Sequence, residues 1–340
     1  MIGTPVRFFH LFVKRQGSAL VLTLLVISTL TGLTIAFSSE SSLELNLAGY
    51  ARDYHMAYLA AQSGIHMAVA VLEKDEDKEI DDLDEDWSKM ESTGSPMTLP
   101  EDTSLSVRIV DETGKFNLNT LITSKGTDHD QAGDESNVNT ENEAALMRLF
   151  EALGLPENMA APILDWVDAD NIERLEGAEN HYYQNLKKPY ACANGPFTTT
   201  GQVFLVKGMK DIEKFGEGKD RDLLDFLTVY PKEEKININT ARKEVLQCLH
   251  EKIDAALAES IIERREEQRF SNLKDLGDFL SQETLSLDTT IRSEIQERVT
   301  MKSSCFSLEA LGRYKESEAA IRAVVHRTDR GMKLFYWRVM

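Results

Sequence analysis

Cysteine is scarce in this chain of 340 residues, and the three that occur lie far apart, at Cys192, Cys248 and Cys305. Their dispersion excludes the paired spacing of a zinc motif. The chain also lacks H-E-x-x-H, G-x-S-x-G, a Walker loop and a glycine-rich dinucleotide fingerprint. We therefore expect no catalytic residues. In an oxidising compartment two of the cysteines could pair, Cys192 with Cys248 for example, but spacing does not fix the connectivity.

Basic residues are in deficit. The chain has 38 Lys and Arg against 57 Asp and Glu, and its formal net charge is -19 at pH 7. A protein that binds nucleic acid needs basic side chains to neutralise phosphates. The composition therefore argues against a nucleic-acid partner. It is compatible with divalent cations, which bind carboxylates.

The longest uncharged run lies near the N-terminus. Residues 18–37 carry no charge and are numerous enough to cross a bilayer as a helix. Three basic residues and no acidic one precede this run, so the positive-inside rule places the N-terminus in the cytoplasm. The order basic, Gly17, Ser18, apolar resembles a class III signal, which prepilin peptidase cuts after the glycine. Two alternatives are a plain single-pass anchor and a secretory peptide cleaved near residues 34–36.

Helical spacing continues beyond the apolar run. No proline occurs in residues 38–73. Apolar or small residues recur there at helical spacing: Leu43, Leu47, Tyr50, Tyr54, Ala57, Ala61, Ile65, Ala68 and Leu72. The pattern predicts one rod over residues 18–72, roughly 80 Å long. The alternative is two helices with a break near residues 38–42.

Strand patterns occur in two places far apart in the sequence. Residues 103–110 alternate, and three short runs near the C-terminus predict an antiparallel meander: 305–311, 319–327 and 333–339. Neither part buries an apolar face alone, so we expect one sheet packed on the lower half of the rod. The acidic residues 73–86 predict a solvated linker, and residues 92–100, with glycine and proline, a loop.

The region between these strands is mostly helical in its spacing. The expected helices are 141–153, 156–167, 241–249, 253–265 and 289–298, with shorter pieces at 201–207 and 273–280. Two similar phrases open its halves, F-N-L-N-T at 116–120 and I-N-I-N-T at 236–240. Asn and Thr act as helix caps and turn acceptors, so we expect capping at both and the stronger cap at the second.

One loop of this region has the composition of a metal site. Its oxygen-bearing candidates are Asp165, Asp168, Asp170, Asn171, Glu176 and Glu179, with Gly177 permitting a sharp turn. Calcium takes six to eight hard oxygen ligands from flexible loops of this kind. The register is not that of an EF-hand, and a solvated acidic loop is the alternative.

Five phrases together resemble the K-type minor pseudopilins of the type II secretion system. They are R-Q-G-S-A-L at 15–20, K-F-N-L-N-T-L at 115–121, D-W-V-D-A-D at 165–170, E-G-A-E-N-H-Y-Y at 176–183 and I-N-I-N-T-A at 236–241. They follow the family's order over nearly the whole chain. The acidic residues 73–86 and a polar insertion at 126–137 depart from the pattern without touching these phrases.

The resemblance implies an α+β fold, pilin-like, with a long transmembrane helix on a small antiparallel sheet and a large inserted all-α domain. The expected parts are a prepilin leader 1–17, the helix 18–72, a linker and first strand 73–111, the inserted domain 112–300 with halves of about 112–235 and 236–300, and C-terminal strands 301–340. The family's α-domain binds calcium, which makes the acidic loop the calcium candidate. The implied place is the bacterial inner membrane, with a single pass and the body in the periplasm.

The resemblance also implies an assembly. Members form the tip of a short pseudopilus with the I- and J-type minor pseudopilins, help to initiate its assembly, and serve export of folded proteins across the outer membrane. With Ser18 as mature residue one, residue five is Leu22, where shaft subunits keep a glutamate, and this suits an end position. We expect partners to dock on Leu22 and on the stripe Leu43, Leu47, Tyr50 and Tyr54.

Two other functions compete with this one. A minor pilin of a related type IV pilus would share the leader and the fold. I-N-I-N-T-A-R-K-E-V-L at 236–246 also resembles the opening of a helix-hairpin-helix DNA-binding module. The glycine-rich hairpin of that module is missing, L-H-E-K-I at 249–253 stands in its place, and the local helices carry many glutamates. We therefore expect no nucleic acid as a partner.

Overall fold

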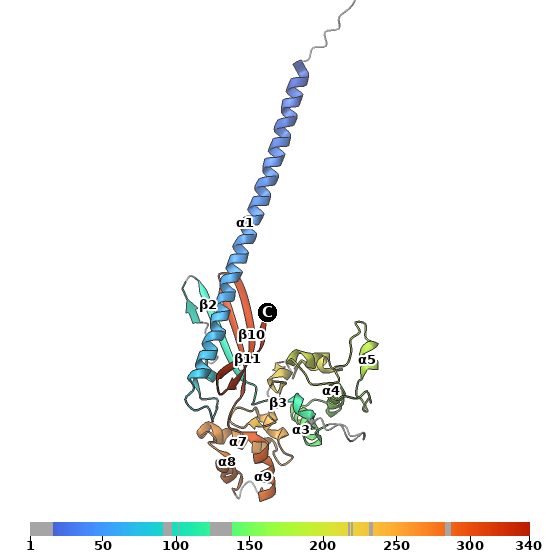
Figure 1. Ribbon diagram of the computed structural model, residues 1–340, viewed down its shortest axis with the longest axis vertical. Helices are drawn as coiled ribbons and strands as arrows, with labels where there is room; N and C mark the ends of the chain where they lie inside the picture. The colour runs from blue at the N-terminus through green and yellow to red at the C-terminus, as the bar shows by residue number, and fades with distance from the viewer. Residues whose placement is uncertain are drawn as a thin grey trace, which may run out of the picture.

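The computed structural model describes residues 16–90, 97–100, 102–122, 138–216, 218, 220–230, 234–282 and 287–340. Residues 1–15 of the expected leader and the polar insertion at 126–137 lie outside these ranges. The described residues form a long helix, a sheet on its lower end, and a domain inserted between two strands of that sheet (Figure 1).

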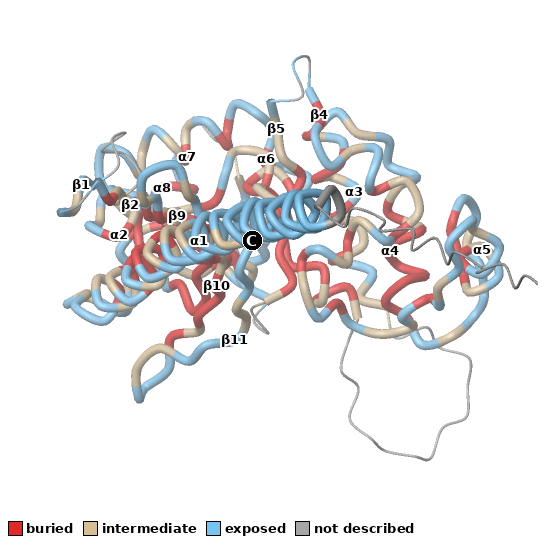
Figure 2. The backbone as a smooth tube through the Cα atoms, turned by 90° about the horizontal axis from the view of Figure 1, so that it is seen from above, coloured by how far each residue is buried: buried red, intermediate tan, exposed pale blue. Residues whose placement is uncertain are grey.

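The long helix is α1, Gln16–Lys74, which is unbroken over 59 residues and about 90 Å long. The expected rod is confirmed, and the alternative break near residues 38–42 does not occur. The upper part of α1 is exposed along its length (Figure 2). From Ala19 onward it contains a stretch long and apolar enough to cross a membrane. Only the lower part packs on the body, through Ala57, Ala61, Ile65, Ala68 and Leu72.

Five antiparallel strands form the sheet in the order β1-β2-β9-β10-β11. They are β1 Met97–Leu99, β2 Thr103–Asp111, β9 Cys305–Tyr314, β10 Ser317–Thr328 and β11 Gly331–Val339. The predicted strand 103–110 and the meander are confirmed, each strand slightly longer than expected. The expected loop 92–100 is wrong at 97–99, because these residues pair with the free edge of β2.

The helix lies directly on β9. A Cβ atom on Gly312 would come within 2.1 Å of the Ala57 carbonyl oxygen and 2.5 Å of the Ala61 nitrogen, so only glycine permits this approach. The short helix α2, Asp86–Lys89, closes one end of the core with Trp87, whose ring meets Phe306 edge-on at 5.4 Å. The apolar faces of α1 and the sheet therefore form one core.

The expected solvated linker at 73–86 is only partly solvated. Asp81 and Asp82 are buried, with exposures of 0% and 7%. Arg327 of β10 donates to both oxygens of Asp81, at 2.7 and 2.9 Å, and Arg269 donates to Asp82. Basic partners distant in the sequence thus bring these carboxylates inside. The expectation failed because local composition does not reveal such partners.

The inserted domain leaves the sheet after β2 and returns before β9. Its first half contains β3 Phe116–Asn117, α3 Thr140–Leu153, α4 Ala160–Val167, α5 Asn180–Gln184, β4 Lys214–Phe215, β5 Arg221–Asp222 and β6 Leu227–Thr228, with 3-10 turns η1 Leu118–Leu121, η2 Glu157–Met159, η3 Thr200–Leu205, η4 Met209–Ile212 and η5 Leu223–Asp225. Its second half contains β7 Ile236–Asn237, α6 Lys243–Cys248, α7 Ala255–Glu267, α8 Leu273–Leu280, α9 Thr289–Glu297 and β8 Val299–Thr300. The expected helix 156–167 is a 3-10 turn followed by α4, and the piece 201–207 is a 3-10 turn.

The two similar phrases occupy equivalent places in the halves. Each begins with a two-residue parallel pairing, β3 with β6 and β7 with β8. Asn119 binds the backbone of buried Phe197 through both ends of its amide, at 2.8 and 2.9 Å. Asn239 does the same to Phe270, at 2.9 and 3.0 Å. The halves therefore repeat one local structure.

The expected ranking of the caps is wrong. Asn117 caps η1 by accepting from the Asn119 nitrogen. The N-cap of α6 is Arg242, which makes no side-chain cap bond. Asn237 accepts instead from the Asn239 nitrogen at 2.9 Å, which forms a turn before the helix begins.

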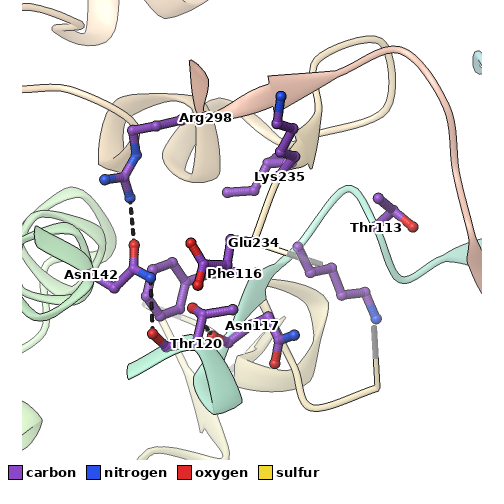
Figure 3. A pocket seen from close by; sticks show the side chains of 10 residues that line it. Thr113, Phe116, Asn117, Thr120, Asn142, Glu234, Lys235 and Arg298 are labelled. Atoms are coloured by element: carbon purple, nitrogen blue, oxygen red, sulfur yellow. Dashed lines mark hydrogen bonds between the residues drawn. The ribbon is translucent and has the colours of Figure 1, made fainter. Parts of the chain in front are cut away.

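Polar contacts join the halves to each other and to the sheet. Figure 3 shows the contact between halves, where Arg298 donates to Asn142 and Asn142 donates to the Thr120 carbonyl. At the junction with the sheet, the fully buried Glu112 accepts from Lys115 at 2.8 Å and from Thr228 and Ser307. These contacts join the two halves to each other and the first half to the sheet.

Candidate metal centre

Helix α4 places the first residues of the acidic loop. Its apolar side chains are buried, and the Trp166 ring meets Tyr183 edge-on at 5.1 Å and stacks near Phe197 at 6.3 Å. Asp165 lies on this buried helix, and the chain turns to extended backbone at Asp168. The aromatic packing therefore fixes where the loop begins.

Asp165 closes the loop from inside. Its Oδ2 accepts from the backbone nitrogens of Arg174 at 3.2 Å and Ala178 at 2.8 Å. A Cβ on Gly177 would lie 1.9 Å from this oxygen, so the close approach requires glycine. Both oxygens of Asp165 are occupied by the chain itself, which gives this residue a structural role.

Arg174 bridges two of the carboxylates. Its Nη1 lies 2.6 Å from Asp165 Oδ1 and 2.5 Å from Asp168 Oδ2. One guanidinium thus offsets part of the repulsion between two buried acids. It leaves Asp168 Oδ1 unused.

Three carboxylates meet at the base of the loop. One oxygen each of Asp168, Asp170 and Glu179 lies within 4.8 Å of the others. Asp168 and Glu179 are buried, at 2% and 3% exposure. Among the described residues, Asp168 Oδ1 and both Glu179 oxygens have no hydrogen-bond partner. Buried acceptors without a partner are costly, and a bound cation would satisfy them.

The electrostatics of this group point the same way. Burial, together with the nearby charges of Asp165 and Asp168, raises the pKa of Glu179 to about 7. Burial also raises the pKa of Asp168, although its hydrogen bond from Arg174 opposes the change. Clustered acids of this kind lose their mutual repulsion when a divalent cation binds.

The other candidates lie around this group. Asn171 Oδ1 accepts from Asn180 and Asn194. Glu176 is exposed, and the structure does not bring its carboxylate into the group of three. Sequence reasoning missed Asn194, which donates to the Asp170 carbonyl at 2.5 Å. Its Oδ1 is buried without a partner among the described residues. Its only sequence signal is a polar residue 24 positions after Asp170.

These oxygens fit calcium. The donor set is hard and anionic, with a neutral amide oxygen beside it, and it lies on an irregular loop. A second carboxylate group, Asp75, Asp81 and Glu85, has a different character. Arg327 binds Asp75 and Asp81, and Arg269 lies 3.6 Å from Glu85. That group is an ion-paired network.

The expected docking residues are on the free face of α1. Leu22, Leu43, Leu47 and Tyr50 are 58–70% exposed, and Tyr54 is 45% exposed. Gly17 and Ser18 lie in the first turn of α1. The three cysteines are buried, and no disulfide joins Cys192 to Cys248 in the part of the chain that the structure describes.

Comparison with known proteins decides the family. The models described as "Type II secretion system (T2SS), protein K" match residues 114–231 and 236–298, which together exceed half of the chain. The chain belongs to the type II secretion system protein K family. It is a minor pseudopilin of that system, and its apolar α1 fits a single-pass membrane anchor with a folded body.

Individual relatives agree with this assignment. Type II secretion system protein K of Pseudomonas aeruginosa is 28% identical over 280 residues, covering 79% of this chain and 78% of that protein. The protein K of Aeromonas hydrophila is 28% identical over 204 residues, covering 58% of this chain and 60% of its own. A chain in the crystal structure of the GspK-GspI-GspJ complex from enterotoxigenic Escherichia coli shares the fold, with a TM-score of 0.64 and 19% identity over 85% of this chain and 97% of that chain.

Proposed function

We propose that this protein K caps the pseudopilus and does not repeat along its shaft. The observation that carries the proposal is the position of the inserted domain, which lies at the end of α1 opposite to the apolar segment (Figure 1). A subunit stacked ahead along the axis of a packed fibre would need that space. At the tip the space is empty.

Leu22 supports the same position. It would be the fifth residue after cleavage at Gly17, and it carries no charge. A carboxylate inside the apolar core of a fibre is costly unless a neighbour's amine pairs with it. A subunit without this carboxylate suits an end, where one neighbour is missing.

The partners proposed for the cap are the I- and J-type minor pseudopilins. The relative from Escherichia coli was crystallised in a complex with GspI and GspJ. On this chain, exposed Leu43, Leu47, Tyr50 and Tyr54 offer an apolar stripe on α1 above the sheet. Helices of neighbouring subunits can bury such a stripe at helical spacing.

Immunogold labelling of sheared fibres tests the capping role. Label at one end supports the cap, and label along the shaft contradicts it. Leu43→Asp combined with Tyr50→Asp tests the stripe, since buried unpaired charges weaken an apolar interface. Co-purification with the I- and J-type subunits should be lost. Leu45→Asp, which adds the same charge on the opposite face of α1, should keep it, and retention by the double variant would contradict the proposed interface.

Processing is proposed to occur at Gly17. Prepilin peptidase would cut before Ser18, N-methylation would follow, and α1 would remain on the mature chain. The order of basic residues, glycine and apolar helix supports this. Intact mass from cells with and without the peptidase should give two N-termini. A cut near Phe37, or an uncut chain in the presence of the peptidase, would overturn it.

Before assembly, the body is proposed to lie in the periplasm beside the inner membrane. Three basic residues precede the apolar run, which favours a cytoplasmic N-terminus. A protease added to spheroplasts should digest the body. Protection of the body with intact membranes would contradict this orientation.

The acidic loop is proposed to bind calcium. Asp168, Asp170 and Glu179 would supply carboxylate oxygens, and the Oδ1 atom of Asn194, which has no partner among the described residues, would add a neutral ligand. Arg174 holds Asp168 so that one of its oxygens stays free. Asn171 and Glu176 are peripheral, and Asp165 holds the loop closed. Melting in calcium and in chelator, with elemental analysis, tests the site. Equal midpoints and no bound calcium would refute it.

A further inference from the structure

Two large apolar side chains stand out from the acidic loop into solvent. Leu175 is 90% exposed, more than any other large apolar residue of the described chain, and Ile172 is 65% exposed. Single exposed apolar residues are common on protein surfaces and need no explanation. These two differ because they lie three residues apart on a loop that the rest of the domain holds firmly.

The backbone of this loop is tied on both sides. Asp170 accepts from the Ile172 nitrogen at 2.7 Å, and Asp165 accepts from the nitrogens of Arg174 and Ala178. Lys207 donates to the carbonyls of Glu176 and Gly177, at 3.2 and 2.9 Å. The chain therefore keeps Leu175 outside with a fixed backbone, so little ordering is left for a binding partner to impose.

The loop also contains local strain. Glu176, directly after Leu175, has a φ of 66°, in the left-handed region that residues other than glycine rarely adopt. Strain of this kind persists only where the surroundings enforce it, and it gathers at functional sites. Here it turns the chain directly after Leu175, whose side chain stays exposed.

Beside the two apolar side chains, the exposed charges that the loop itself carries share one sign. Glu173 and Glu176 are exposed beside them. The one basic residue within the loop, Arg174, points inward to Asp165 and Asp168. The outer surface is thus an apolar tip with an acidic border. Such a border repels anionic lipid headgroups and attracts a surface edged by Lys and Arg.

The loop lies far from the surfaces that pilin-like subunits share. It leads directly into α5, which occupies the end of the inserted domain farthest from α1 in both views (Figures 1 and 2). A subunit packed along α1 therefore does not reach it. Its partner must approach the inserted domain from the side.

We propose that residues 170–178 form a docking loop, which inserts Leu175 and Ile172 into an apolar pocket bordered by basic side chains on a protein other than the pseudopilins that pack on α1. This docking role depends only on the assignment of the chain to the secretion system. It is independent of calcium binding at the base of the loop and of the position of the subunit in the fibre.

Site-specific photo-crosslinking in secreting cells tests it directly. The probe is p-benzoylphenylalanine in place of Leu175 in the full chain, and the control is the same probe in place of Leu273 of α8, which is 38% exposed. We expect position 175 to crosslink to a protein whose reacted peptide carries apolar residues next to Lys or Arg. Adding Glu173→Lys should lower the yield about fivefold or more, because it reverses a border charge.

The outcomes separate the alternatives. Crosslinks only to lipid, only to the I- or J-type pseudopilins, or equally from positions 175 and 273 would overturn the proposal. Secretion is the second measurement. Leu175→Asp and the uncharged Leu175→Ser should both lower export with unchanged melting temperature, and Leu175→Met should keep it. Export at the wild-type level in Leu175→Asp or Leu175→Ser would also overturn it.

Discussion

Arg327 Nη1 lies 2.7 Å from Asp81 Oδ1 and 2.9 Å from Oδ2, and both side chains are buried. The pair joins strand β10 to the segment that follows α1, across 246 positions of sequence. The same guanidinium reaches Asp75 at 3.0 Å and lies over the Phe306 ring at 5.0 Å. It therefore anchors the lower end of the membrane helix to the sheet.

Removing one partner of this buried ion pair should strongly destabilise the folded protein. Arg327→Met leaves Asp81 unpaired inside the protein, and we expect a loss of about 3–5 kcal/mol in the free energy of unfolding. Denaturant unfolding of the detergent-solubilised chain measures it. Arg330→Met, the same change at an exposed position, should cost little. Combining Arg327→Met with Asp81→Asn should recover part of the loss, and an equal loss in both Arg variants would show that the pair is unimportant.

The same acidic segment should make stability depend on pH. Burial raises the pKa of Glu85 to about 8 and that of Asp81 to about 7, above the ordinary values of these groups. A carboxyl whose pKa is raised in the folded state stabilises the fold at low pH, and that contribution is lost as pH rises through the folded pKa. We therefore expect the melting temperature to fall between pH 6 and pH 8.5.

Glu85→Gln isolates this effect. The amide keeps an oxygen for the Trp87 Nε1 hydrogen bond and removes the buried charge. The variant should melt a few degrees higher than the wild type at pH 8.5, roughly 2–5 °C, and its melting temperature should change less with pH. Asp84→Asn removes an exposed charge, 81% accessible, as the control. Parallel pH profiles for wild type and Glu85→Gln would contradict the assignment.

These buried acids mark where local sequence stops being informative. Residues 73–86 have the composition of a solvated linker, and nothing nearby shows that Arg327 and Arg269 will bind them. The strands were predictable because alternation is a local property, as in 103–110. The junction of sheet and inserted domain was not, since Glu112 finds Thr228 and Ser307 only in the folded chain.

The candidate site divides in the same way. Its carboxylates were predictable because they are neighbours in sequence, and the loop brings Asp168, Asp170 and Glu179 together. Their separate roles were not. Asp165 accepts hydrogen bonds from backbone nitrogens, and Glu176 is exposed to solvent. Asn194 contacts Asp170 although it lies 24 positions later in the sequence. The sequence shows that Asn119 and Asn239 occupy the same place in two similar phrases. It does not show that each binds the backbone of a buried phenylalanine, because that contact forms only in the folded chain.

The different roles of the acidic residues in this loop predict different calcium affinities for their variants. Asp170→Asn and Glu179→Gln should each weaken calcium binding about tenfold or more, because each removes a ligand charge. Glu176→Gln, an equal charge change on the same loop, should bind as the wild type does. Isothermal titration of the detergent-solubilised chain measures the three affinities. Equal weakening by all three would mean that net loop charge, and not the group of three, holds the ion.

Asp165→Asn should behave differently from the ligand variants. Its amide nitrogen would face Arg174 or the backbone donors of the loop, so buried hydrogen bonds are lost whether calcium is present or not. We expect a loss of about 2–4 kcal/mol in the free energy of unfolding, equal in calcium and in chelator. A loss seen only in calcium would show that Asp165 is a ligand after all.

The contact between α1 and β9 gives the last prediction. A Cβ at Gly312 would lie 2.1 Å from the Ala57 carbonyl oxygen, and this atom belongs to the helix backbone, so relief requires the whole helix to move. Gly312→Ala should therefore lower the free energy of unfolding by about 2–4 kcal/mol and loosen α1 from the sheet.

Gly49→Ala is the matched control, because its Cβ would meet nothing within 4 Å. In mid-helix that change should stabilise by up to about 1 kcal/mol. Denaturant unfolding gives both values, and proteolysis near Ala57 reports the loosened helix. If Gly312→Ala were as stable as Gly49→Ala, the helix would not lie against the sheet as closely as this structure places it.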